Sequence, residues 1–207
     1  MDVLPLAWPQ TPIHLVLAGS AVAAVTFFAV GLTGYFERSP RPMWVLVIHY
    51  GSMLLALLQT AGVIFLKPRS DVFASIGIGM FTLSIVLYLA AIEAAKRTRL
   101  QRSFIDHPLP DRLITDGPFR WMRHPFCAGY LLGALAPSIA IDDLRMIATA
   151  LPLVAITFYA AIREERVWLA SPRGDAYRAY KKQTGMFIPF LVAGRFRKFK
   201  GFNEFKG

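Results

Sequence analysis

The sequence predicts an all-α fold, an integral membrane helical bundle with about five transmembrane helices. Apolar residues make up 55% of the 207 residues, which is more than soluble domains usually contain. They are gathered in long runs without charged side chains, and short segments rich in charge and proline separate these runs. Because roughly 20 apolar residues in a helix cross the hydrocarbon core of a bilayer, each long run predicts one crossing.

Three long runs lie in the first half of the chain, at residues 13–36, 43–66 and 72–95. The first two contain no Asp, Glu, Lys or Arg, and the third contains only Glu93, near its end. Proline and charged residues between the runs predict turns there. Residues 1–95 are therefore expected to form an N-terminal region of three membrane helices, and residues 96–207 a second region.

Two shorter apolar runs, at residues 125–141 and 144–162, predict a helical hairpin in the second region. Pro125 suits the first turn of a helix, where its missing N–H would have no partner. Asp142 and Asp143 mark the turn between the two runs. At about 1.5 Å per residue these runs reach about 25 to 28 Å, so local thinning of the bilayer must complete each crossing.

Basic residues predict the orientation of the bundle. With five crossings, 20 of the 23 Lys and Arg residues fall on one side of the membrane. Because cytoplasmic segments are enriched in Lys and Arg, we expect the N-terminus outside and the C-terminus in the cytoplasm, in a bacterial inner membrane or an endoplasmic reticulum membrane. The net charge of +10 lies between and after the apolar runs, so the expected partners are membrane lipids with anionic headgroups, and no nucleic acid.

Two groups of ionisable residues flank the predicted hairpin. Arg123 and His124 precede its first helix, and residues 163–166 (Arg-Glu-Glu-Arg) follow its second. Each residue alone fits a snorkelling side chain or a solvated ion pair. A tight hairpin makes the two groups neighbours, however, and ionisable groups gathered at a membrane boundary commonly line a functional site. We therefore expect a site at the cytoplasmic end of the hairpin.

Other residues of this region have simpler interpretations. Tyr177 and Tyr180 lie on one face of a helix predicted after Gly174, and they fit the aromatic belt at a membrane surface. Cys127 is the single cysteine and fits a small apolar residue at a helix start better than a nucleophile. The four histidines have no metal-ligand spacing, so no metal is expected. Phe residues alternate with basic residues at 195–206, which predicts an interfacial segment on anionic lipid.

Residues 113–189 contain an ordered set of short motifs. Its members are Leu113-Ile114-Thr115-Asp116-Gly117-Pro118-Phe119, Arg123-His124-Pro125 followed by Gly129, Glu164-Glu165, Gly174 with Tyr177 and Tyr180, and Ile188-Pro189. In this order and spacing the set resembles the isoprenylcysteine carboxyl methyltransferase and phospholipid methyltransferase family, which consists of integral membrane enzymes that use S-adenosylmethionine. The first three helices resemble this family only in being membrane helices.

The resemblance implies roles for individual residues. The positions that match the family's cofactor site are Leu113, Ile114, Phe119, His124, Pro125, Phe126, Cys127 and Glu165. Glu165 would hold the cofactor by pairing with its ammonium, because hydrogen bonds between charged groups are strong. Arg123 or Arg163 would orient an anionic group of the substrate. Glu164 would remove the proton of an amine acceptor.

The implied function is S-adenosylmethionine-dependent methyl transfer to a lipid-like acceptor in the membrane, with the cofactor bound in a cytoplasmic C-terminal region. An isoprenylcysteine carboxylate is the most similar acceptor, and thiol and amine acceptors stay open. Two positions depart from the family, because its arginine before the acidic pair falls at Ala161 and its usual tyrosine is Cys127. The sequence leaves open how these two departures affect the substrate and the activity. It also leaves open the oligomeric state.

Two other functions compete with methyl transfer. Sterol reductases, which use NADPH, are similar in their C-terminal half, but they carry Asn after His-Pro and an acidic residue after the glycine. This chain has Phe126 and Tyr130 at those positions, which disfavours reduction. A non-enzymatic membrane scaffold or adaptor could use the basic tail to hold lipid, but it would leave the clustered Glu and His residues without a role.

Overall fold

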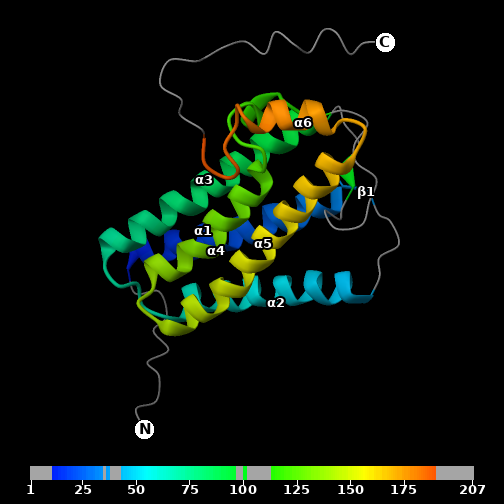
Figure 1. Cartoon of the computed structure of the whole chain (residues 1–207). Coiled ribbons are helices and arrows are strands. Elements are labelled where there is room, and N and C mark those ends of the chain that lie inside the picture. Colours follow the sequence, from blue (N-terminus) through cyan, green and yellow to red (C-terminus); the bar gives the residue numbers. More distant parts are fainter. Residues whose placement is uncertain (1–10, 35, 38–42, 97–99, 102–112, 190–207) are drawn as a thin grey trace.

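The computed structural model describes residues 11–34, 36–37, 43–96, 100–101 and 113–189 (Figure 1). In chain order its elements are α1 (Pro12–Gly34), β1 (Phe36–Glu37), α2 (Met43–Phe65), α3 (Asp71–Ala95), β2 (Leu100–Gln101), the 3-10 helix η1 (Gly117–Arg120), α4 (Pro125–Ala140), α5 (Leu144–Ala170) and α6 (Gly174–Lys181). Helices dominate, which confirms the predicted all-α fold. β1 and β2 add one short parallel pairing. The basic and aromatic tail at 195–206 lies outside the described residues.

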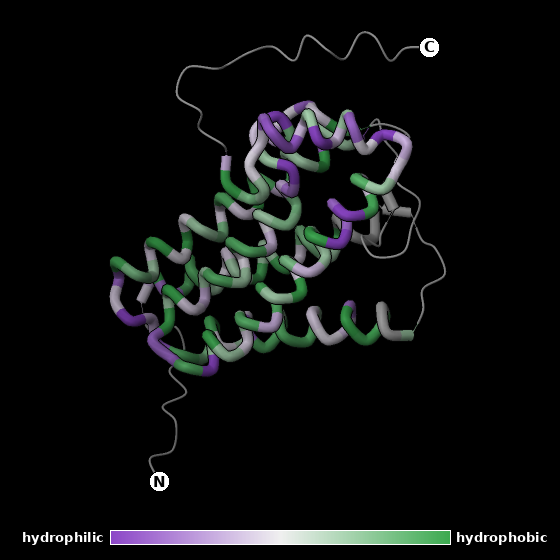
Figure 2. The backbone as a smooth tube through the Cα atoms, in the orientation of Figure 1, coloured by the Kyte–Doolittle hydropathy of each residue, from purple (hydrophilic) through white to green (hydrophobic). Residues whose placement is uncertain are grey.

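The helices match an integral membrane bundle. Among the described residues, α1, α2, α3 and α5 are long and apolar enough to cross a membrane, and Figure 2 shows apolar residues along most of their length. This confirms the membrane prediction. α4 differs from the expected fifth crossing, because it has 16 residues and reaches about 24 Å at about 1.5 Å per residue. That is less than the roughly 30 Å of a bilayer core.

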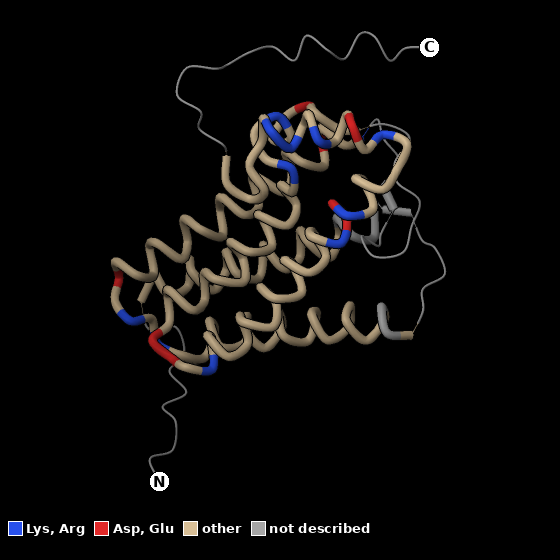
Figure 3. The backbone as a smooth tube through the Cα atoms, viewed as in Figure 1, with Lys and Arg blue, Asp and Glu red and all other residues tan. Residues whose placement is uncertain are grey.

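In the part of the chain that the structure describes, charged residues gather at two ends of the bundle and its middle is uncharged (Figure 3). At one end the N–H of Arg69 donates to Ala140 O at 2.9 Å, and His14 Nε2 lies 2.8 Å from Val63 O. There the starts of α1 and α3 meet the ends of α2 and α4. The start of α4 and the end of α5 meet at the other end, which confirms the expected hairpin. The side of the membrane that each end faces remains a prediction.

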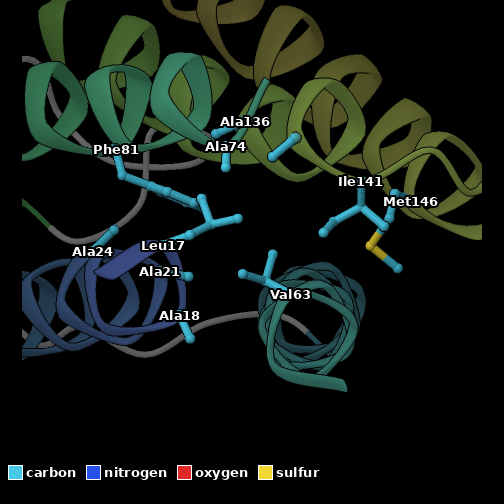
Figure 4. Packing of buried hydrophobic residues seen from close by; sticks show 11 residues of the cluster. Leu17, Ala18, Ala21, Ala24, Val63, Ala74, Phe81, Ala136, Ile141 and Met146 are labelled. Atoms are coloured by element: carbon cyan, nitrogen blue, oxygen red, sulfur yellow. The ribbon is translucent and has the colours of Figure 1, made fainter. Parts of the chain in front are cut away.

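Small side chains allow the helices to pack closely around a core of buried residues from α1 to α5 (Figure 4). A Cβ added to Gly77 would lie 2.8 Å from the Cβ of Ala140, so α3 and α4 could not approach as closely with a larger residue. Farther along the same contact, Ser84 Oγ donates to Gly129 O at 2.7 Å. Close packing and interhelical hydrogen bonds are the forces that hold helices together in lipid.

α5 is longer than predicted, because it continues past residue 162 to Ala170. The added residues are mostly good helix formers, and the helix ends where Ser171 Oγ donates to Trp168 O at 2.7 Å. The chain then turns sharply into α6. A Cβ at Gly174 would lie 2.4 Å from Leu169 O, so only glycine fits at this turn. As a result α6 folds back over the end of α5.

Candidate functional site

The site is built where three segments far apart in the sequence meet. The chain that follows α6 runs beside the residues that lead into α4. The N–H of Gly185 donates to Trp121 O at 3.1 Å, Arg123 N–H donates to Gly185 O at 2.8 Å, and His124 N–H donates to Met186 O at 3.1 Å. These backbone bonds fix the start of α4 against the chain after α6, and the end of α5 lies next to both.

Glu165 on α5 is the centre of the polar cluster. Its side chain is 7% exposed and accepts a hydrogen bond from Arg123 Nε at 2.7 Å. Its other oxygen accepts from Lys181 Nζ at 2.5 Å. A buried carboxylate is costly unless it is paired and hydrogen-bonded, so these two cations keep Glu165 ionised inside the protein.

The guanidinium of Arg123 donates hydrogen bonds to other groups of the protein. Its side chain is 8% exposed, and its Nη1 donates to the carbonyl oxygens of Thr184 and, at 3.3 Å, Lys181. The guanidinium therefore ties together the start of α4, Glu165 and the end of α6. Its expected role in orienting a substrate stays a prediction, and the contacts described here make it a positioning residue.

His124 is buried between the two glutamates. Its Nδ1 lies 3.7 Å from Glu164 Oε2 and its Nε2 lies 3.4 Å from Glu165 Oε1, and its ring lies against Phe187, with centroids 6.0 Å apart. Among the described residues, Nε2 is buried without a hydrogen-bond partner. An unsatisfied buried polar atom costs about 1 to 3 kcal/mol, so this nitrogen is a place where a bound molecule would gain a hydrogen bond.

Glu164 and Arg163 face different surroundings although they are neighbours in α5. Glu164 lies next to His124 with its side chain 26% exposed, so a solute can reach it. Arg163 Nη1 donates to the hydroxyl of Tyr159 at 3.4 Å, on an exposed part of α5. Residues two apart in a helix point about 200° away from each other. The fold therefore joins Glu164 and Glu165 to His124 and directs Arg163 away from Glu165.

Aromatic and aliphatic residues lie beside this cluster. Phe119 and Phe126 are buried and make an edge-to-face contact with centroids 6.0 Å apart. Ile114 packs against the buried apolar group that contains Phe119 and Phe126. Leu113 packs instead against Trp168 and the tyrosines of α6. These predicted cofactor contacts thus lie on two sides of the segment that leads into α4.

Pro125 and Cys127 lie in the first turn of α4. Pro125 follows the N-cap residue His124, where no N–H is needed. Cys127 is free and buried, which agrees with its interpretation as a small apolar residue. Their expected contacts with a cofactor remain predictions.

The prediction of an aromatic belt for Tyr177 and Tyr180 is wrong. These residues are 2% and 3% exposed. The rings of Trp168 and Tyr177 stack with centroids 5.6 Å apart, and the Tyr180 hydroxyl donates to Phe119 O at 2.5 Å. Both tyrosines fasten α6 to α5 and to η1. Burial, together with the negative charge of Glu165 and Glu164, raises the pKa of Tyr177, and burial raises the pKa of Tyr180, so both hydroxyls stay protonated.

Lys181, Thr184 and Phe187 reach the site without having been predicted from the sequence. Residues 177, 180, 181 and 184 follow the spacing of one helix face, and this spacing could have pointed to Lys181 and Thr184. Phe187 lies beyond α6, and its ring packs against Phe158 with centroids 4.7 Å apart. Its place depends on the backbone pairing with the start of α4.

Comparison with known proteins agrees with this arrangement. The model of the phospholipid methyltransferase family matches residues 72–172. Protein-S-isoprenylcysteine O-methyltransferase A of Arabidopsis thaliana is 28% identical over 148 residues, which cover 69% of this chain and 75% of the relative. A probable protein-S-isoprenylcysteine O-methyltransferase of Oryza sativa subsp. indica is 27% identical over 144 residues, 68% of this chain and 75% of the relative.

A shorter match has higher identity. The protein-S-isoprenylcysteine O-methyltransferase of Schizosaccharomyces pombe is 32% identical over 81 residues, 38% of this chain and 34% of the relative. The family match includes α4, most of the polar cluster and the turn that precedes α6. These relatives are named methyltransferases, which disfavours the reductase and scaffold alternatives. Residues 72–172 therefore match the phospholipid methyltransferase family, the chain is similar to protein-S-isoprenylcysteine O-methyltransferases, and its enzyme class is methyltransferase.

Proposed function

We propose that this protein transfers a methyl group from S-adenosylmethionine to a lipid-like acceptor held in the membrane, and that an isoprenylcysteine carboxylate is the first acceptor to test. The observation that carries the proposal is His124, whose buried Nε2 has no hydrogen-bond partner among the described residues and lies beside two glutamates. The names of the relatives support the choice of acceptor.

The chemistry of the side chains fits this cofactor. S-adenosylmethionine carries a sulfonium and an ammonium, and the cluster supplies the carboxylate of Glu165 to pair with the ammonium. His124 supplies a ring nitrogen that has no hydrogen-bond partner among the residues that the structure describes, and the neighbouring residues supply apolar contacts. The residues that would hold the cofactor are Leu113, Ile114, Phe119, His124, Pro125, Phe126, Cys127 and Glu165.

Positioning is the main contribution of the protein to this reaction. When bound, the cofactor supplies an electrophilic methyl group whose carbon–sulfur bond breaks as the acceptor's bond to carbon forms. A carboxylate acceptor needs no proton removed, whereas an amine acceptor does, and the partly exposed Glu164 is the base within reach. Arg123 keeps Glu165 in place. Arg163, on the outer side of α5, is the candidate partner for an anionic group of the acceptor.

The proposed topology has the N-terminus outside and the C-terminus in the cytoplasm, which requires the short helix α4 to make a fifth crossing where the bilayer is locally thinned. The cofactor would enter from the cytosol, and the acceptor would enter from the bilayer near the α4–α5 hairpin. In this arrangement residues 1–95 form the membrane region and residues 96–207 the catalytic region. A reporter fused after Gly207 should then be cytoplasmic, and a signal from the opposite side of the membrane would contradict the topology.

Equilibrium binding of S-adenosylmethionine to the protein purified in detergent tests the site. Wild type and Tyr177→Phe, which keeps the stacked ring, should bind saturably. Glu165→Gln and His124→Ala should lose most of the affinity while keeping the helical circular dichroism signal. Folded wild type that binds no S-adenosylmethionine would overturn the proposal.

The acceptor is tested separately by transfer of a labelled methyl group. A farnesylated N-acetylcysteine offers a carboxylate, and phosphatidylethanolamine offers an amine. We expect label in the former, and Glu164→Gln should leave that transfer within about threefold of wild type because a carboxylate needs no base. Label in phosphatidylethanolamine alone would assign an amine acceptor instead.

A further inference from the structure

Glu165 has two cationic partners whose side chains differ in exposure to solvent and in how many other contacts hold them. Arg123 is 8% exposed and is also anchored to the carbonyl of Thr184. Lys181 is 43% exposed, although it lies at hydrogen-bond distance from Glu165 Oε2. One oxygen of the carboxylate is therefore closed off by a buried guanidinium, and the other is covered by an ammonium that water and solutes can reach.

The Lys181 backbone is fixed while its ammonium can move. Its carbonyl oxygen accepts from Arg123 Nη1 at 3.3 Å, and it is the last residue of α6. A lysine side chain has a flexible four-carbon stem and three donors, so Nζ can move by an ångström or so, as an order-of-magnitude estimate, without moving the helix. Glu165 and Lys181 thus present an anchored negative charge beside a mobile positive charge at the open side of the site.

An α-amino acid group carries the complementary pair, because its ammonium and its carboxylate share one carbon. We infer that Lys181 is a specificity-determining residue that binds the carboxylate of the cofactor's amino-acid moiety while Glu165 binds its ammonium. This inference rests on the proposed function. The Lys181–Glu165 ion pair opens to admit the two ligand charges, so each of the four charges gains a partner of opposite sign.

Two ligands that differ only in this carboxylate test the inference: S-adenosylmethionine and its decarboxylated analogue, both measured by equilibrium binding without acceptor. Wild type should bind S-adenosylmethionine about tenfold or more tightly than the analogue, since a charge-assisted hydrogen bond is of this size. Lys181→Met should lose this preference by weakening only S-adenosylmethionine. Lys181→Arg should keep most of it.

Lys182 provides the matched control, because it is exposed and adjacent in the chain. Lys182→Met should bind both ligands as wild type does, and thermal unfolding of every variant should be measured alongside. If Lys181→Met weakens both ligands equally, the ion pair only docks α6, and if it weakens neither, Lys181 does not contact the ligand; either result overturns the inference alone. Absence of binding by folded wild type would overturn this inference together with the proposed function.

Discussion

The two ends of the α4–α5 hairpin use ion pairs in different ways. At the turn, Arg145 donates to Asp143 two residues earlier, with the two side chains 50% and 22% exposed. At the site, Arg123 pairs with Glu165 across 42 positions of sequence, and both side chains are buried. An exposed local pair contributes about 0 to 1 kcal/mol, whereas breaking a buried pair leaves an uncompensated charge. The first pair caps the start of α5 locally, and the second depends on the whole fold.

The largest effect is expected from breaking the buried pair. Arg123→Met should lower the free energy of unfolding by about 3 to 5 kcal/mol, because Glu165 would remain buried without its best partner. Denaturant unfolding in detergent micelles measures this loss. The double variant Arg123→Met/Glu165→Gln should recover most of it, and equal losses in Arg123→Met and Asp143→Asn would remove the contrast between the two ends.

A smaller loss is expected at the turn into α6. Gly174→Ala would place a Cβ 2.4 Å from Leu169 O, so the turn must open, at about 1 to 3 kcal/mol. The same unfolding assay applies. Gly79→Ala is the control, because a Cβ there would meet nothing within 4 Å and alanine is the better helix former. If Gly174→Ala left the free energy of unfolding unchanged, α6 would dock with more freedom than its contacts indicate.

The hydrogen bond from Tyr180 to Phe119 O should contribute less again. Tyr180→Phe leaves the buried carbonyl without its donor, at about 1 to 2 kcal/mol. Tyr50→Phe removes a hydroxyl from a residue that is 64% exposed and should change the free energy of unfolding very little. Equal effects of the two substitutions would show that the bond to Phe119 does not hold α6 in place.

The smallest change in the free energy of unfolding is expected at the turn between α4 and α5. Asp143 caps α5 by accepting from Arg145 N–H at 2.9 Å, so Asp143→Ala should cost about 1 kcal/mol at pH 7. The hydrogen bond from the Arg145 side chain lowers the pKa of Asp143 in the folded state. The ionic part of the stabilisation is thus present above the unfolded pKa of about 4 and is lost as pH falls through the folded pKa. If the loss of free energy of unfolding caused by Asp143→Ala grew below pH 4, it would contradict the predicted pH dependence.

Much of the architecture follows from local patterns. The uncharged runs predicted the long helices, Pro125 the start of α4, and Asp142-Asp143 the hairpin turn. The end of α5 could not be predicted in this way, because the charged residues at 163–166 resemble a helix exit although the helix continues to Ala170. The tyrosines of α6 were misplaced for a related reason, since an amphipathic aromatic residue suits a membrane surface and a buried helix contact equally well.

The sequence by itself determined that this chain is a helical membrane protein of the methyltransferase class, because hydrophobic run length and ordered motifs are properties of the chain alone. It also determined that Glu165 and His124 would be neighbours, because a hairpin joins its own ends. The tertiary structure decided that Arg123 and Lys181 pair with Glu165 and that, among the described residues, one nitrogen of His124 has no hydrogen-bond partner. Those facts depend on where α6 docks, and docking is set by the packing of Trp168, Tyr177 and Tyr180, which no local pattern specifies.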